Sequence, residues 1–206
     1  MKLTHNTKLE HLMGELRRGY GLQEERNLEE AKQVYRGVVE EARRLGFESG
    51  FALWNLAIAS DYAGELDMAF DYIVQAIAAD PLARPFRDSF DVIARRLREA
   101  LTASGRAADD PATPRLYELL TRAGEADVAA HAAMARWCVA TGDHARALAI
   151  AEAVTLLHPA DPDAWLCKAE AARAAGQPEV AALATAEAAA LDGAPVPFAV
   201  PGVARG

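Results

Sequence analysis

One spacing constrains the fold of this chain more than any other feature of its sequence. Gly142 and Gly176 lie 34 residues apart, and each is followed by an alanine five residues later and by a second small or β-branched residue twelve residues later. Gly64 has the same surroundings, 78 residues before Gly142. A chain that repeats one local pattern at an interval of this length builds the same structural unit several times and stacks the copies.

The repeated unit is expected to be a pair of helices. The apolar run before each glycine predicts a first helix and the run after it a second, because glycine readily adopts the left-handed backbone that ends a helix. Alanines seven residues before each glycine and five residues after it would let the two helices approach closely. These alanines are Ala57, Ala69, Ala135, Ala147, Ala169 and Ala181. Proline or glycine follows seventeen residues after each of the three glycines and is expected to end the second helix.

This register resembles the tetratricopeptide repeat. The stretch from Trp54 through Gly64 to Pro81 looks like a nearly complete copy, and the stretches 135–159 and 163–188 look like two more. The resemblance implies an all-α fold: a right-handed α-solenoid of stacked antiparallel helix pairs, with about ten helices. The abundance of alanine, and of arginine over lysine, suggests a bacterial source.

The predicted organisation has two sets of helices. Residues 1–103 form an N-terminal set whose clearest repeat is 48–81, residues 104–112 a polar loop, residues 113–191 a C-terminal set, and residues 192–206 a proline-rich extended tail. The ten helices are expected at roughly 8–20, 28–45, 49–63, 66–79, 85–103, 114–123, 126–140, 144–157, 162–174 and 178–190. The pattern departs from the repeat over 82–125, so a continuous array and two shorter arrays hinged near residue 107 both stay open. A plain helical bundle is a further alternative.

The composition argues against several classes of protein. A net charge of −8 disfavours a nucleic-acid partner. The sequence has no signal peptide and no long uncharged apolar run, so a cytoplasmic protein without membrane insertion is expected. The two cysteines, Cys138 and Cys167, cannot form a disulfide framework and are expected to be buried. No phosphate-binding loop, metal-ligand spacing or nucleophile motif occurs, so we expect no catalysis, no cofactor and no metal site.

The resemblance also implies a groove on the concave face, lined by the first helix of each pair. The residues that it places there are Phe51, Trp54, Ile58, Asp61, Tyr62, Asp88, Val92, Arg95, Arg96, Arg136, Leu166, Glu170 and Arg173. Some relatives hold a terminal carboxylate with lysine and asparagine at such positions. Trp54 and Ile58 stand at two of them here, so this kind of clamp is not expected.

The aromatic and apolar stripe beside Arg95 and Arg96 suits a helix or extended peptide of a partner protein, with an acidic flank. Part of the stripe, Trp54 above all, could instead pack between repeats. We therefore expect a non-catalytic scaffold or adaptor for protein–protein interaction. A self-associating assembly protein, for example a homodimer, is the alternative, and a regulatory subunit or enzyme that uses the array only for docking is a remote one.

Overall fold

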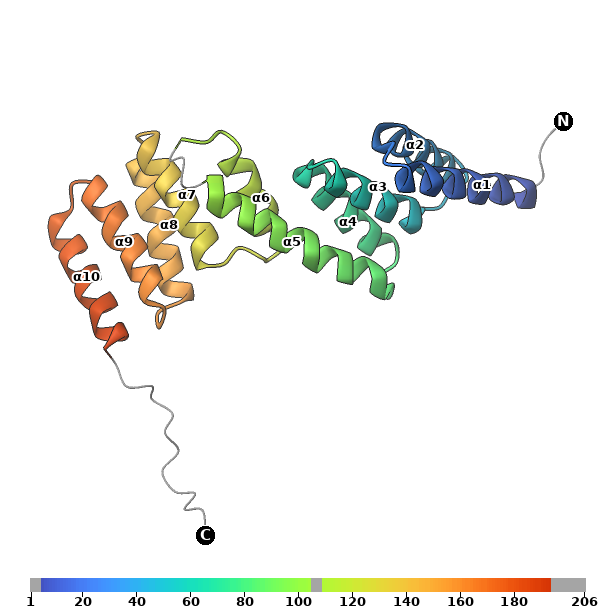
Figure 1. Ribbon diagram of the computed structural model, residues 1–206. Coiled ribbons are helices and arrows are strands. Elements are labelled where there is room, and N and C mark those ends of the chain that lie inside the picture. Colours follow the sequence, from blue (N-terminus) through green and yellow to red (C-terminus); the bar gives the residue numbers. More distant parts are fainter. Residues whose placement is uncertain (1–4, 105–108, 194–206) are drawn as a thin grey trace, which may run out of the picture. The chain divides into compact units, whose positions relative to one another are not determined.

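The chain is all-α over the part that the structure, a computed structural model, describes, which is residues 5–104 and 109–193 (Figure 1). Ten helices and no strand occur in these two ranges. They are α1 (His5–Glu24), α2 (Leu28–Arg44), α3 (Gly50–Tyr62), α4 (Leu66–Ala79), α5 (Arg84–Ser104), α6 (Thr113–Arg122), α7 (Val128–Ala140), α8 (His144–Leu157), α9 (Pro162–Ala174) and α10 (Pro178–Asp192). The predicted fold class and number of helices are confirmed.

The chain folds into two compact units, Met1–Ala100 and Leu101–Gly206. In the first unit α1 packs on α2, α2 on α3, and α3 on α4. In the second unit each helix from α6 to α10 packs on the next, and α7 also contacts α9 across α8. Helix pairs therefore stack within a unit, as predicted. Residues 105–108 of the predicted loop and residues 194–206 of the predicted tail lie outside the described residues.

The predicted glycines end the first helix of their pairs. Gly64, Gly142 and Gly176 have φ of 80°, 82° and 72°. After α7, the N–H of Asp143 donates to the carbonyl of Cys138 at 2.8 Å, which is the bond that closes a helix end of this type. The Asp143 carboxylate then accepts a bond from the N–H of Arg146 and caps α8. One short turn thus ends the first helix and begins the second.

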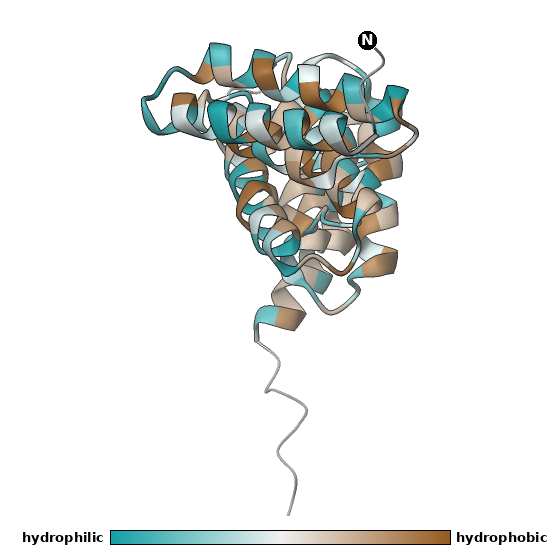
Figure 2. Ribbon diagram, turned by 90° about the vertical axis from the view of Figure 1, so that its right-hand side faces the viewer, coloured by the Kyte–Doolittle hydropathy of each residue, from teal (hydrophilic) through white to brown (hydrophobic). Residues whose placement is uncertain are grey.

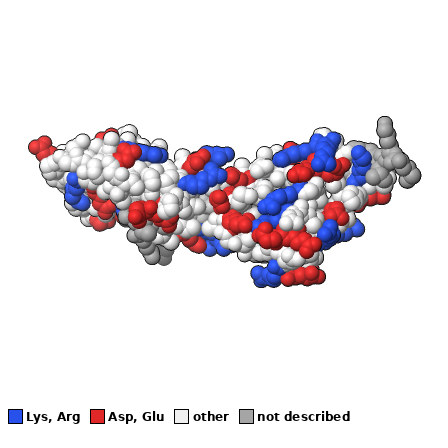
Figure 3. Space-filling model, turned by 90° about the horizontal axis from the view of Figure 1, so that it is seen from above, with Lys and Arg blue, Asp and Glu red and all other residues white. Residues whose placement is uncertain are grey.

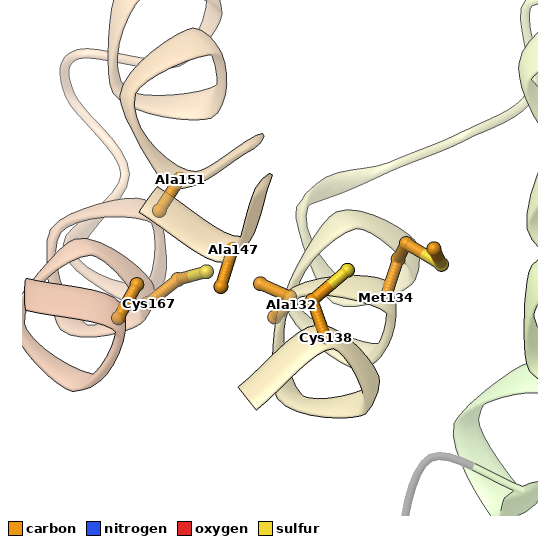
Figure 4. Close-up of a cluster of buried hydrophobic side chains, with 8 residues drawn as sticks. Ala132, Met134, Cys138, Ala147, Ala151 and Cys167 are labelled. Carbon is orange, nitrogen blue, oxygen red and sulfur yellow. The ribbon is translucent and has the colours of Figure 1, made fainter. Parts of the chain in front are cut away.

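The alanines of the repeat are buried where the paired helices meet. Ala57, Ala69, Ala147 and Ala169 are 0% exposed, and Ala135 and Ala181 are 3% exposed. Figure 4 shows the corresponding cluster in the second unit, where small side chains of α7, α8 and α9 point toward one another. Hydrophilic and hydrophobic residues are interspersed along the helices in Figure 2. The predicted role of these alanines in close packing is confirmed.

The first helix is longer than the sequence suggests. It continues through Gly19 and Gly21 to Glu24, whereas the prediction ended it at residue 20. Gly19 serves a contact between helices, since a Cβ there would lie 2.5 Å from Cε1 of the buried Tyr35 on α2. The left-handed residue in the turn between α1 and α2 is Arg26, with φ of 63°.

A buried lysine joins the first two helix pairs. Lys32 on α2 is 1% exposed, and its Nζ lies 2.6 Å from Glu29 Oε1 and 2.7 Å from Glu65 Oε1. Glu65 is the N-cap residue of α4, so the ammonium group ties α2 to the start of α4. Burial alone would lower the pKa of Lys32, but hydrogen bonds to Glu29 and Glu65 outweigh it and the pKa is raised. The buried lysine therefore stays charged.

Two glycine-to-alanine substitutions in the first unit test the left-handed turn. Neither Gly64 nor Gly37, within α2, has an atom that an added Cβ would meet. Gly64→Ala should lower the free energy of unfolding by about 1 kcal/mol or more because of its positive φ. Gly37→Ala, on the exposed side of a helix, should raise it by about 0.5–1 kcal/mol. Urea unfolding followed by circular dichroism measures both, and equal effects of the two substitutions would contradict the assignment.

Candidate functional site

A hollow lies between α3 and α5 in the first unit. It has a volume of about 330 Å³, and we call it the α3–α5 hollow. Its lining is Ile58, Asp61, Tyr62, Asp88, Ser89, Val92 and Ile93. Five of these are residues that the sequence places in the groove, namely Ile58, Asp61, Tyr62, Asp88 and Val92. The structure therefore brings together most of the residues predicted on this face of the first unit.

The arginines predicted beside this face are paired with carboxylates of the chain. Arg96 forms an ion pair with Asp61, whose side chain is 11% exposed. Asp61 stands in the last turn of α3, where a negative charge opposes the helix dipole, so Arg96 compensates an unfavourable position. The Arg95 guanidinium lies 3.4 Å from Glu99, and both of these side chains are exposed.

Trp54 packs between α3 and α5. Its indole N–H donates to the Ser89 hydroxyl at 2.9 Å, and its ring centroid lies 5.8 Å from that of the buried Phe86. The alternative role of Trp54, packing between repeats, is therefore the one that these contacts support. Phe51 rests edge-on against Phe86 at 5.4 Å and stays 58% exposed. Tyr62 is 56% exposed, with the Arg26 guanidinium 5.6 Å from its ring centre.

A second hollow lies between α7 and α9 in the second unit. It has a volume of about 280 Å³, and we call it the α7–α9 hollow. Its lining is Val128, Ala129, Ala132, Arg136, Asp163, Leu166, Cys167 and Glu170. Arg136, Leu166 and Glu170 were predicted in the groove, and they meet here. Arg173 was predicted with them, but its guanidinium donates to the Thr185 hydroxyl of α10 at 3.3 Å.

The lining of both hollows includes residues that the sequence analysis did not single out. Asp163 precedes Leu166 by three residues and Glu170 by seven, so helical periodicity alone would place it on the same face. Cys167 is buried beneath that face. No sequence signal identifies Ser89 as the acceptor for Trp54, because that contact joins residues 35 positions apart.

The described residues contain no group of three or more His, Cys, Asp and Glu side chains placed to hold a metal ion. Over the same ranges, no helix combines the length and the apolar character needed to cross a bilayer. Charged side chains of both signs are interspersed over the surface in Figure 3.

A comparison of the sequence with models of protein families finds a repeat made of paired helices in the second unit. The sequence model of the tetratricopeptide repeat matches residues 128–171, which span α7, α8 and most of α9. Residues 128–171 are therefore identified as a tetratricopeptide repeat. Such repeats are scaffolds for protein–protein interaction, and the expected general function is supported at this level. No curated protein matches the chain in sequence.

Three solved structures align with most of this chain at low sequence identity. MamA of AMB-1 is 16% identical over 94% of this chain and 98% of its own, with a TM-score of 0.46. The complex of the TPR2AB domain of yeast Sti1 with pHSP90 is 15% identical over 88% of this chain and 78% of its own, with a TM-score of 0.37. BtubC from P. vanneervenii is 18% identical over 91% of this chain and 84% of its own, also with a TM-score of 0.37. At these values the likenesses do not bear on the partners of this chain.

The two thiols of this chain should be unreactive while it is folded. Burial raises the pKa of Cys138, and burial together with the nearby Glu170 carboxylate raises the pKa of Cys167 to about 11. At about pH 8 the folded thiols are therefore less ionised than free cysteine, and the thiolate is the reactive form. Ellman's reagent should react slowly with the native protein and quickly with both cysteines in denaturant. One thiol that reacts at once in the native state would contradict the burial.

Proposed function

We propose that this chain binds a peptide or helical segment of a partner protein at each of two sites, the α3–α5 hollow of the first unit and the α7–α9 hollow of the second. The observation that carries the proposal is the convergence of predicted groove residues in two hollows, one in each unit. Each hollow lies between two first helices of the repeat, and eight of the thirteen predicted residues line one or the other. The proposal gives the chain a binding role and no catalytic step.

The exposed apolar side chains in these hollows support the proposal. Tyr62 is 56% exposed, Val92 44% and Leu166 42%, and each of them lines one of the two hollows. Side chains of this kind, seated at the edge of a concave site, are the anchors that dominate binding energy at protein interfaces. A helix or strand that lays its apolar side chains in either hollow would cover the exposed side chains there.

An acidic flank on the partner is compatible with the pairing of the arginines. The ion pair between Arg95 and Glu99 is exposed, and exposed pairs of this kind contribute about 0–1 kcal/mol. A carboxylate of the partner can therefore replace Glu99 at little cost. The buried pair of Arg96 with Asp61 is better regarded as part of the scaffold, since Asp61 is shielded from solvent.

Substitutions in the two hollows test the proposal after a partner has been captured and identified from the source cells. Tyr62→Ala and Leu166→Ala should each weaken binding about tenfold, which corresponds to about 1.4 kcal/mol. Leu82→Ala is the matched control, because Leu82 is 90% exposed between α4 and α5 and lies outside both hollows. Titration calorimetry measures the affinities, and circular dichroism checks that all three variants stay folded. Wild-type affinity in both test variants would reject the proposed sites.

Self-association is the second candidate function. It is favoured by three leucines of the second unit that are exposed without lining either hollow: Leu156 at 82%, Leu157 at 67% and Leu183 at 69%. Exposed apolar side chains of this size are used at contacts between copies of a chain. Light scattering over a range of protein concentrations distinguishes the two functions, since self-association predicts a mass that rises with concentration.

A further inference from the structure

A third hollow lies on α6 and the start of α8, away from the first helices that carry the proposed groove. It has a volume of about 590 Å³ and includes Pro111, Pro114, Tyr117, Arg122 and Arg146. We call it the arginine hollow. It shares no residue with the α3–α5 hollow or the α7–α9 hollow. Any role that it has is therefore separate from the proposed groove.

The charge of the arginine hollow differs from that of the chain. The chain carries a net charge of −8, yet the lining holds Arg115, Arg122 and Arg146 against the single carboxylate of Glu118. The Glu118 carboxylate forms an ion pair with the Arg115 guanidinium at 3.4 Å. No ion pair joins Arg122 or Arg146 to another residue of the described ranges. Two positive charges therefore face solvent without a partner.

The placement of Arg146 is not explained by the stability of its helix. It stands in the first turn of α8, the positive end of the helix dipole, where a cation is unfavourable. The nearest capping carboxylate, that of Asp143, accepts the backbone N–H of Arg146 at 3.1 Å. A bound anion would benefit from both the guanidinium and this end of the helix. Arg122, in the last turn of α6, stands at the favourable end of its helix.

An apolar wall lies beside the two arginines. Pro111 and Pro114 line it together with Tyr117, whose hydroxyl lies 2.8 Å from His131 Nδ1. Burial raises the pKa of Tyr117, while its hydrogen bond with Thr121 and the charge of Arg146 oppose the rise. Arg146 lines the same hollow as Tyr117. Tyrosine, proline and arginine together form the type of surface that binds an acidic segment with an apolar neighbour.

We propose that the arginine hollow is a second protein-binding site, which takes an acidic peptide segment of a partner. Its carboxylates bind the guanidinium groups of Arg122 and Arg146, which suit planar, two-pronged contact with carboxylates. An aromatic or proline side chain next to them packs on Tyr117 and the two prolines. The volume lies within the range of about 300–1,000 Å³ that is typical of ligand pockets.

A short synthetic peptide serves as the probe. The acetylated and amidated sequence Gly-Glu-Glu-Phe-Pro-Gly carries two carboxylates beside an aromatic residue and a proline. We expect the peptide to bind the chain saturably, as measured by two-dimensional NMR. The His131 ring signal should shift, because His131 Nδ1 lies 2.8 Å from the Tyr117 hydroxyl. Replacing both glutamates of the peptide by glutamine should weaken binding at least tenfold. Raising the salt concentration should also weaken it.

Protein variants separate a specific site from general attraction. Arg122→Glu with Arg146→Glu should abolish binding, while Arg122→Lys with Arg146→Lys should retain part of it because the charge is kept. Arg173→Glu, at an exposed arginine outside the hollow, is the matched control and should bind as wild type does. Thermal unfolding confirms that each variant is folded.

Three results would overturn the proposal. The first is an absence of saturable peptide binding. The second is unchanged binding by the double glutamate variant. The third is displacement of the peptide by inorganic phosphate at equal concentration, which would make the hollow a simple anion site. Because Tyr62 and Leu166 play no part, failure here leaves the proposed groove untouched, and failure of the groove leaves this site untouched.

Discussion

The fold depends on small side chains at the contact within each helix pair. Ala147 and Ala151 of α8 are completely buried between Cys138 of α7 and Cys167 of α9. A larger side chain at the alanine positions would push the helices apart, because interiors of proteins are packed without spare volume. The same small residues recur before and after Gly64 and Gly176, so one packing solution is used again along the chain.

Close packing within pairs decides where binding surfaces can form. In the second unit, Ala147 and Ala151 of α8 belong to a buried cluster with residues of α7 and α9. The α3–α5 and α7–α9 hollows each lie between two first helices, and their linings include exposed tyrosine, valine and leucine. Charges near the first hollow are largely paired within the chain, as Arg96 is with Asp61. The arginine hollow differs, since Arg122 and Arg146 lack such partners among the described residues.

Local sequence signals predicted most of the fold and part of the site. Left-handed glycines, helix caps and apolar periodicity act within a few residues, so all ten helices and the turn at Gly142 could be predicted. Contacts between distant residues could not, because no local pattern encodes them: the Lys32–Glu65 pair, the Trp54–Ser89 bond and the Tyr117–His131 bond are examples. The end of α1, predicted near residue 20, was missed, because the helix continues to Glu24 and Gly19 within it packs on Tyr35. Among the groove residues, Arg173 was placed by helical register alone, and its bond to Thr185 directs it to α10.

The central claim, that buried alanines set the approach of paired helices, is tested most directly by two leucine substitutions in α8. Ala147 is 0% exposed, whereas Ala145, two residues earlier in the same helix, is exposed. Leucine and alanine are both good helix formers, so the comparison isolates packing. Urea unfolding should show that Ala147→Leu loses about 1–3 kcal/mol of stability, while Ala145→Leu changes it by less than about 0.5 kcal/mol. Equal stability of the two variants would contradict the account.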